Sequence, residues 1–426
     1  THLIQGLYDA HRNGAKVLAL ASHIPSRQIG SKFFQETHPE AIFQECSGYC
    51  EMVNSAEQGG VVLHHAIQST MAGNGVSVLV IPGDVSMQDA EDDSFVESKI
   101  SAGRPVVFPD PAEAAALTQA INEAESVTLF VGAGVKDARE QVLKLAEKIK
   151  APIGHALGGK MYIQYENPFD VGMNGLLGYG AAHEATHEAD LLILLGTDFP
   201  YNDFLPDANV AQVDINGSHI GRRTKISYPV TGDVAATIEN ILPHVDEKKD
   251  RSFLDKMLKK HYGKLEHVVE AYTSNVDKHT PIHPEYVADL IDKNADEDAI
   301  FTVDTGMCNV WGARYITANG KREQIGSFRH GTMANALPQA LGAQAANPGR
   351  QVITFSGDGG LSMLMGELLT VKLHNLPIKM FVFNNSSLGM VKLEMLVQGL
   401  PEHETDHESV NFAKIAEASG IKHFRI

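Results

Sequence analysis

Short apolar runs that recur along the chain constrain its fold more than any other feature. Each run consists mainly of consecutive Val, Ile, Leu or Phe and is followed by a turn rich in Gly, Asn or Asp. Consecutive rather than alternating apolar residues are typical of strands buried on both faces of a parallel sheet. The runs occupy residues 17–21, 76–81, 127–131, 190–195, 210–215, 299–303, 351–355 and 378–383.

Helical stretches lie between these runs, for example at residues 112–125, 138–150 and 361–374. An alternation of strand, turn and helix predicts the α/β class with doubly wound parallel sheets. The 426 residues are enough for about three domains of roughly 100–200 residues each. A polar, proline-containing stretch at 97–111 and a linker at 246–282 separate the predicted units, which are 1–100, 110–245 and 283–426.

Both ends of the chain are expected to be truncated. The first residues already follow a helical pattern, and residues 424–426 are typical of the middle of a strand. The chain carries 35 Lys and Arg against 53 Asp and Glu, a formal net charge of −18. Because duplex binding needs clustered basic residues, this balance argues against nucleic acid as the main partner. The apolar runs are far shorter than the ~20 residues that span a bilayer, so no transmembrane helix is expected.

The segment 351–385 carries the strongest functional signal. A buried run is followed by Gly357-Asp358-Gly359-Gly360, a helical stretch, a turn, and a second apolar run that ends at Asn384-Asn385. A parallel β-α-β crossover brings both strand ends to one edge of the sheet, where ligands bind in open α/β sheets. Asp358 and Asn385 are therefore predicted to lie together.

The residue types at this edge suit one task. A carboxylate oxygen and an amide oxygen are ligands that Mg²⁺ accepts, and protein-bound Mg²⁺ usually bridges to substrate phosphates. Gly359 and Gly360 let the backbone approach a phosphate, and a helix that starts near Leu361 would point its positive end at the same place. A lone Gly-Asp-Gly is usually only a turn. Its pairing with Asn384-Asn385 across one crossover predicts a magnesium–diphosphate site.

The middle unit shows a weaker nucleotide signal. Gly132-Ala133-Gly134 follows a predicted strand but lacks the full G-x-G-x-x-G pattern, so a tight turn explains it equally well. Asp214 ends another predicted strand, where a carboxylate can accept a ribose hydroxyl. These residues alone do not separate FAD from NAD.

The pair Gly357-Asp358-Gly359 and Asn384-Asn385 resembles the diphosphate motif of thiamine diphosphate (ThDP) enzymes. The resemblance implies that Asp358, Asn385 and the main-chain carbonyl of Ser387 bind Mg²⁺. It implies that the segment from Gly331 to Met333 holds the cofactor rings, with Met333 bending the cofactor. The full set of implied ThDP-binding residues is Gly331, Thr332, Met333, Asp358, Gly359, Gly360, Asn385, Ser386, Ser387, Leu388, Gly389, Met390 and Val391.

Further segments resemble the quinone-linked pyruvate oxidases, also called pyruvate dehydrogenase (quinone). They are residues 2–6, 25–26, 34–39, 195–197, 199–201, 214–216, 326–328 and 333–344. The resemblance implies the C-terminal part of a pyrimidine-binding domain in 1–100, a Rossmann-like FAD domain in 110–245 and an incomplete diphosphate-binding domain in 283–426. The implied FAD contacts are Asn174, Gly175, Leu176, Leu177, Thr197, Asp198, Phe199, Pro200, Tyr201 and Asp214.

The resemblance also implies an activity, which is oxidative decarboxylation of pyruvate to acetate and CO₂. Electrons would pass through FAD to a membrane quinone, and Phe34 and Met390 would line the catalytic pocket. The Glu that activates ThDP in this family would precede Thr1, so the fragment is not expected to complete the reaction. The implied assembly is a homodimer or homotetramer. The implied location is cytoplasmic and peripheral to the inner face of the cell membrane, through a C-terminal segment beyond Ile426.

Two alternatives stay open at this point. Acetohydroxyacid synthases, which also carry FAD, join the same two-carbon unit to a second keto acid without net oxidation. Segments 38–39 and 199–201 favour the oxidase over the synthase. The second alternative is a catalytically silent scaffold that holds nucleotides without turnover.

Overall fold

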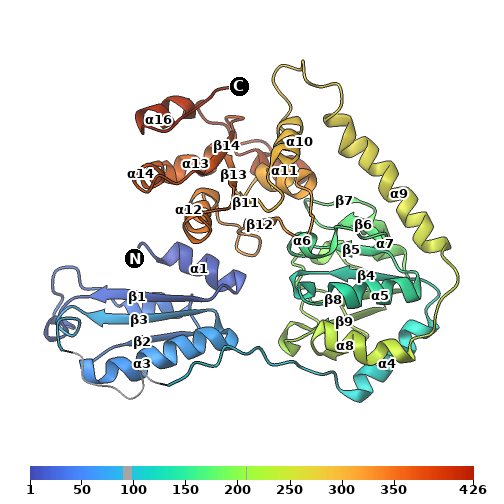
Figure 1. Ribbon diagram of the computed structural model, residues 1–426, viewed down its shortest axis with the longest axis horizontal. Coiled ribbons are helices and arrows are strands. Elements are labelled where there is room, and N and C mark those ends of the chain that lie inside the picture. The colour runs from blue at the N-terminus through green and yellow to red at the C-terminus, as the bar shows by residue number, and fades with distance from the viewer. Residues whose placement is uncertain (90–97, 208) are drawn as a thin grey trace. The chain divides into compact units, whose positions relative to one another are not determined.

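The structure is a computed structural model that describes residues 1–89, 98–207 and 209–426 (Figure 1). It has two compact units, which are treated separately here: Thr1–Pro105 with Ser327–Thr332, and Val106–Gly326 with Met333–Ile426. Glu97, the start of the predicted first linker, lies outside the described residues. Within the described residues, none of the helices combines the length and apolar character needed to cross a membrane.

The first unit contains a parallel three-stranded sheet with the order β1-β3-β2. The central strand β3 is almost wholly buried because helices and loops cover both of its faces. Helix α3 begins at Ser55, whose side chain accepts a hydrogen bond from the backbone N–H of Gln58 and so caps the helix. The elements are α1 Ile4–Asn13, β1 Val17–His23, α2 Pro39–Gln44, β2 Tyr49–Met52, α3 Ala56–Ser69 and β3 Val76–Pro82.

The second unit holds a seven-stranded sheet with the order β10-β9-β8-β4-β5-β6-β7, parallel except for the pair β6 and β7. Alternate residues of β4 pack into different apolar clusters: Leu129 faces helices α4, α5 and α8, whereas Phe130 faces the opposite side. Burial on both faces is why these strands have continuous apolar sequences. The strands are β4 Val127–Val131, β5 Ile153–His155, β6 Asp170–Met173, β7 Tyr179–Gly180, β8 Leu191–Leu195, β9 Val210–Asp214 and β10 Tyr228–Thr231. The helices are α4 Pro111–Glu123, α5 Arg139–Ile149, α6 Lys160–Ile163, α7 Ala182–Glu188 and α8 Val234–Ile241.

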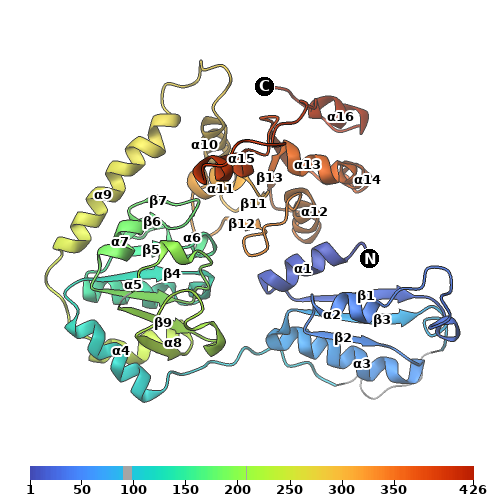
Figure 2. The same cartoon turned by 180° about the vertical axis from the view of Figure 1, so that it is seen from behind.

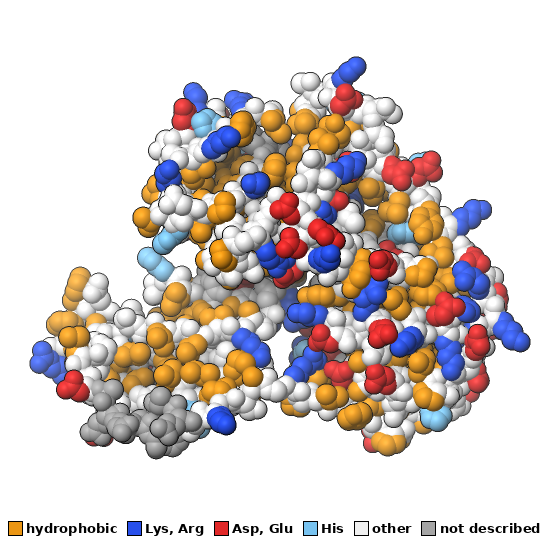
Figure 3. All heavy atoms as spheres, viewed as in Figure 1, with side chains coloured by type: hydrophobic (Ala, Val, Ile, Leu, Met, Phe, Trp, Pro, Cys, Tyr) orange, Lys and Arg blue, Asp and Glu red, His pale blue; other side chains and the backbone are white. Residues whose placement is uncertain are grey.

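The same unit continues through the long helix α9 into a parallel four-stranded sheet with the order β12-β11-β13-β14. Basic and acidic side chains are interspersed over the face that carries α5, α8 and α9 (Figure 3). The strands of this sheet are β11 Ile300–Val303, β12 Glu323–Gly326, β13 Val352–Gly357 and β14 Lys379–Phe383. The helices are α9 Ser252–Val268, α10 Pro284–Asn294, α11 Met307–Tyr315, α12 Ala336–Ala346, α13 Asp358–Leu364, α14 Leu368–Leu373, α15 Gly389–Val397 and α16 Phe412–Ala418.

The structure confirms the α/β class with parallel sheets, and every predicted apolar run contains a strand. Two local predictions were wrong. The expected helix at 361–374 begins at Asp358 and is interrupted by a 3₁₀ turn at Met365–Glu367, so α13 is only 7 residues long. Residues 424–426 have no regular secondary structure and do not form a strand. The predicted unit boundaries stay predictions.

Candidate functional site

The loops that follow β13 and β14 meet at one edge of the four-stranded sheet. Gly357 pairs with Phe383, so Asp358 and the 384–391 loop leave the sheet side by side. The backbone N–H of Ser386 donates to Oδ2 of Asp358 at 2.6 Å, and the N–H of Gly359 donates to Oδ1 at 2.9 Å. The structure therefore brings together the two segments that the sequence pairs.

The loop after β14 is shaped to present Asn385. Ser386 has a positive φ of 54°, which turns the chain sharply, and Oδ1 of Asn385 accepts the N–H of Ser387 at 3.1 Å. Asn385 is exposed, whereas Asp358 is buried. A side chain at Gly389 would place its Cβ 2.9 Å from Nδ2 of Asn385, so glycine leaves room for the amide. The loop that carries Asn385 is therefore held directly against the carboxylate of Asp358.

The two glycines after Asp358 have different neighbours. A Cβ on Gly360 would lie 2.0 Å from Oδ2 of Asp304, whereas a Cβ on Gly359 would lie 2.8 Å from the flexible end of Leu388. The sequence predicts that both glycines admit a phosphate. At position 360 the structure shows a second reason for glycine. The buried carboxylate of Asp304, which follows the neighbouring strand, already occupies the space that a Cβ would need.

Asp304 is a residue that sequence analysis missed. It follows β11, the strand beside β13, and only 1% of its surface is exposed. Its Oδ1 accepts the backbone N–H of Thr305 at 3.0 Å and that of Asn335 at 3.2 Å. Burial raises the pKa of this carboxyl to about 6 in spite of those bonds. The sequence contains a signal that identifies Asp304 as a candidate, because this residue directly follows a predicted strand, as Asp358 does.

The raised pKa of Asp304 gives a testable pH dependence. Between about pH 4 and pH 6 the native state holds this proton more tightly than the unfolded chain, so the free energy of unfolding falls as pH rises through that window. A shift from 3.8 to about 6 corresponds to roughly 3 kcal/mol. We expect Asp304→Asn, which keeps the Oδ1 acceptor, to gain stability relative to wild type as pH rises. Urea unfolding from pH 4 to 7 measures this, and a pH-independent difference between the two proteins would contradict it.

The segment expected to hold the cofactor rings is divided between the two units. Gly331, with a φ of 74°, and Thr332 belong to the first unit, where Thr332 accepts a hydrogen bond from Nε2 of Gln5 at 3.0 Å. Met333 belongs to the second unit, and its Cε lies 3.6 Å from the position of a Cβ on Gly359. Met333 thus reaches the edge that carries Asp358. Phe34 lies in the first unit and is 78% exposed.

The predicted FAD segments lie at the carboxyl edge of the seven-stranded sheet. Gly175 has a φ of 106°, and a Cβ there would lie 3.1 Å from the rings of Phe199 and Tyr201. The structure therefore brings the segment from Asn174 to Leu177 against the segment from Thr197 to Tyr201. The amide of Asn174 already bonds Phe204 O at 2.9 Å and Thr186 Oγ1 at 3.3 Å, so it holds this loop in place.

Two carboxylates at that edge also have charged partners within the fold. Asp214 ends β9 and lies 3.4 Å from Nδ1 of His219, while Asp198 lies 3.3 Å from Nε of Arg223. A Cβ on Gly132 would lie 2.6 Å from Cβ of Thr197, and one on Gly134 would lie 2.7 Å from Cα of Gly196. The glycine pair therefore lets two loops touch, which supports the tight-turn interpretation.

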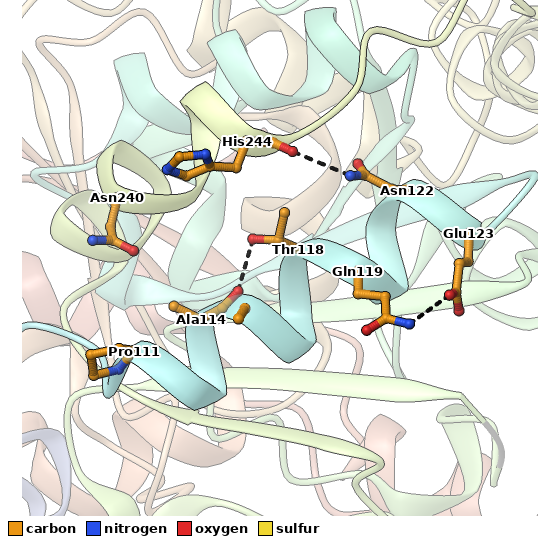
Figure 4. Close-up of a pocket in the computed structure, with 9 residues that line it drawn as sticks. Pro111, Ala114, Thr118, Gln119, Asn122, Glu123, Asn240 and His244 are labelled. Carbon is orange, nitrogen blue, oxygen red and sulfur yellow. Dashed lines mark hydrogen bonds between the residues drawn. The ribbon is translucent and has the colours of Figure 1, made fainter.

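A cavity of about 360 Å³ brings Leu176 and Met390 together. Both come from segments that the sequence assigns to different cofactors, and Met390 lies on α15, beside α11 (Figure 2). The cavity is mainly apolar and aromatic, with Met307, Trp311 and Tyr315 in its lining. A second cavity of about 540 Å³, between α4 and α8, contains none of the predicted site residues (Figure 4). Its polar groups bond within the fold, as Asn122 does to the carbonyl of His244 at 3.2 Å.

Within the described residues, His, Cys, Asp and Glu do not gather in groups of three or more that could hold a metal. A site built only from acidic or thiolate ligands is therefore absent from that part of the chain. The predicted ligand set at the β13–β14 edge is instead mixed, with one carboxylate and neutral oxygens. Such a set suits Mg²⁺, which takes few protein ligands and completes its shell with phosphates and water.

Comparison with known protein families agrees with a diphosphate-binding site at this edge of the sheet. Residues 304–426 match the "Thiamine pyrophosphate enzyme, C-terminal TPP binding domain", and residues 114–241 match the "Thiamine pyrophosphate enzyme, central domain". Thiamine pyrophosphate is another name for thiamine diphosphate. The first match contains Asp304, Asp358 and Asn385, and the second contains the seven-stranded sheet.

The relatives lead to the same class. The chain is 33% identical over 428 residues to YdaP of Bacillus subtilis, provisionally named a thiamine pyrophosphate-containing protein, covering 100% of this chain and 74% of the relative. It is 30% identical over 448 residues to acetolactate synthase of Mycobacterium bovis (99% and 70%). It is 27% identical over 438 residues to pyruvate oxidase of Lactiplantibacillus plantarum (100% and 71%). The chain spans 66% to 74% of the full length of these and one further relative.

The chain belongs to the thiamine pyrophosphate enzyme family. Its cofactor class is therefore ThDP, which is normally used with Mg²⁺. The relatives include enzymes that oxidise pyruvate and enzymes named acetolactate synthase, so family membership alone leaves the reaction open.

Proposed function

We propose that this chain supplies the cofactor-binding part of an enzyme that catalyses the ThDP-dependent oxidative decarboxylation of pyruvate to acetate and CO₂. In this proposal Asp358, Asn385 and the main-chain carbonyl of Ser387 hold the Mg²⁺ ion of the cofactor. The observation that carries it is the 2.6 Å bond between Ser386 N and Asp358 Oδ2, which joins the two predicted ligand loops at one sheet edge. The donor set fits, because it offers hard oxygen ligands beside backbone that can approach a phosphate.

The protein's part in this chemistry is to bind and orient. When bound, ThDP supplies an electron sink for decarboxylation. Asp358 is buried and held by two backbone N–H groups, so its carboxylate has a fixed direction. Met333 supports the proposal as an apolar residue that reaches the same edge, and the partner subunit's Phe34 is the proposed aromatic wall of the pyruvate pocket.

Electrons are proposed to pass through FAD to a membrane quinone. Two features support FAD: the contact between the segments at 174–177 and 197–201, and the cavity that Leu176 shares with Met390. A cavity of about 360 Å³ lined by aromatic and apolar side chains suits a flat ring. Asp214 is the proposed ribose ligand.

The proposed assembly is a homodimer or homotetramer located in the cytoplasm, peripheral to the inner face of the membrane. Exposed apolar side chains on α14 and α15 support association, since Leu373 and Val397 are each 75% exposed. Surfaces of this kind commonly mark an interface. The membrane contact is assigned to a segment outside this chain.

The second candidate is acetolactate synthesis, which transfers the same two-carbon unit to another pyruvate without net oxidation. It is favoured by the 30% identity to acetolactate synthase, which is slightly above the 27% identity to pyruvate oxidase. The same Asp358 edge would serve this reaction. A silent nucleotide-binding scaffold is the third candidate.

Anaerobic turnover separates these candidates. The full-length protein is loaded with ThDP, Mg²⁺ and FAD, mixed with pyruvate without oxygen, and followed by flavin absorbance and product analysis. We expect the flavin to bleach and about one acetate to form per flavin reduced, because oxidation to acetate of the two-carbon unit left after loss of CO₂, with oxygen from water, releases two electrons that FAD accepts. Acetolactate without bleaching would replace the proposal with the synthase, and the absence of any product would favour the silent scaffold.

A further inference from the structure

A fully buried lysine joins the two sheets of the second unit. Lys160 is the first residue of α6, which follows β5 of the seven-stranded sheet, and only 1% of its surface is exposed. Its Nζ donates to the carbonyl oxygen of Ile316, which ends α11, and lies 3.5 Å from that of Gly312 in the same helix. A cation at the carboxyl end of a helix is favourable, because the last carbonyl groups carry partial negative charge. Lys160 therefore caps α11 from a different sheet.

A second contact runs in the opposite direction, from α11 to the loop between β6 and β7. Arg314 of α11 donates through Nη2 to Gly178 O at 3.1 Å and through Nε to Leu177 O at 3.5 Å. The side chain of Leu177 packs against the apolar clusters that contain Trp311 and Ala313 of the same helix. The β6–β7 loop is therefore tied to α11 by polar and apolar contacts together.

The two contacts determine how two walls of the cavity of about 360 Å³ meet. Helix α11 contributes Trp311 and Arg314 to the lining, and the β6–β7 loop contributes Leu176. Lys160 is not among the lining residues, so it acts on the cavity only through α11. Without Lys160 the buried carbonyl oxygen of Ile316 would lose this donor, and without Arg314 the loop would lose its polar contacts with α11. Either loss would let one wall move relative to the other.

We propose that Lys160 and Arg314 are positioning residues, which hold α11 and the β6–β7 loop as adjoining walls of the cavity and so fix the flavin relative to the thiamine site. This inference rests on the proposed function, because it assumes that the flavin ring occupies the cavity. The link to the thiamine site is α11 itself, since its first residue, Met307, follows Asp304 closely in the chain and lines the same cavity. A displacement of about 1 Å at a reacting site can lower a rate by about 100-fold.

Matched substitutions test both contacts. Lys160→Met and Arg314→Met keep most of the side-chain stem and remove its hydrogen-bond donors. The control is Lys148→Met, because Lys148 also donates to the carbonyl of a residue that ends a helix, Leu242 after α8, at 2.8 Å, and it does not line the cavity. The full-length protein is used at pH 7, where Lys160 stays mainly charged although burial lowers its pKa to about 8. Titration followed by flavin fluorescence gives the FAD affinity, and hydrogen exchange without cofactors gives the mobility of residues 174–178.

We expect Lys160→Met and Arg314→Met each to weaken FAD binding by about 10-fold and to speed amide exchange at 174–178 by a similar factor, the scale of a lost hydrogen bond to a charged group. Their double variant should weaken binding by less than the product of the two losses, because both residues hold the same pair of walls. With FAD saturating, flavin reduction by pyruvate should slow by about 10–100-fold. Lys148→Met should match wild type in all three measurements.

Wild-type FAD affinity in both variants, shown to be folded by circular dichroism, would overturn the inference. So would a loss confined to Arg314→Met, which would mean that Arg314 contacts the flavin directly. If Lys160→Met does not fold, hydrogen exchange in cofactor-free Arg314→Met decides, because a residue that only contacts the flavin would leave the loop unchanged. If the wild-type protein binds no FAD, the proposed function fails instead, and the exchange data still test the contact between Arg314 and the loop.

Discussion

Asp358→Ala is expected to lower the affinity for Mg²⁺ and ThDP by at least ~100-fold, more than the ~10–100-fold typical of changes outside the ligand shell. The change removes the only carboxylate of the proposed ligand set. Neutral oxygens from Asn385 and Ser387 would remain, and they cannot offset the charge of a divalent ion bound to diphosphate. Turnover of pyruvate should fall with cofactor occupancy.

The measurement is calorimetric titration of ThDP at fixed Mg²⁺, with Asp358→Asn and Asp277→Ala as companions. Asp358→Asn keeps the shape of the side chain and should give an intermediate loss. Asp277 is exposed in the segment between α9 and α10 and serves as the control. Asp358→Ala also leaves the N–H groups of Gly359 and Ser386 without their acceptor, so circular dichroism must show that the variant folds. ThDP affinity equal to wild type in a folded Asp358→Ala protein would remove Asp358 from the site.

The juxtaposition of Asp358 with the Asn385 loop was predictable because it follows from topology. Continuous apolar runs indicate parallel strands, and one crossover must return the chain to the same edge of the sheet. No contact between distant side chains had to be known. The same reasoning located the strand before Asp304, yet it did not show that β11 lies beside β13, because strand order is set by packing of the whole unit.

Other features depend on contacts that local sequence does not encode. Lys160 reaches the end of α11 only because the seven-stranded sheet packs against that helix, and 156 positions separate it from Ile316 in the chain. The break in the helix after Leu364 was missed because residues 361–374 contain no proline and are mainly good helix formers. For Gly132 and Gly134, the sequence offered a phosphate turn and a tight turn. The structure favours the latter through the close approach of Gly196 and Thr197.

Gly360→Ala is expected to destabilise the second unit by about 3 kcal/mol, the upper end of the range for overpacking a well-filled site. The new Cβ would lie 2.0 Å from Oδ2 of Asp304. Asp304 cannot move aside freely, because it would lose the N–H groups of Thr305 and Asn335 while remaining buried. Gly359→Ala is the matched control in the same helix, since its Cβ meets only the flexible ends of Leu388 and Met333. That variant should change the free energy of unfolding by less than ~1 kcal/mol, because alanine also favours helix.

A double-mutant cycle identifies the cause of the loss. Asp304→Ala removes the carboxylate that the new methyl group meets, so Gly360→Ala should cost much less in that background than in wild type. Urea unfolding of the four proteins gives the coupling free energy, which should exceed ~1 kcal/mol because the two side chains are in direct contact. If the losses in the free energy of unfolding are additive, or if Gly359→Ala costs as much as Gly360→Ala, Asp304 is not the reason that position 360 requires glycine. If Gly360→Ala causes no loss of stability in the cofactor-free wild-type background, the phosphate interpretation alone explains Gly360.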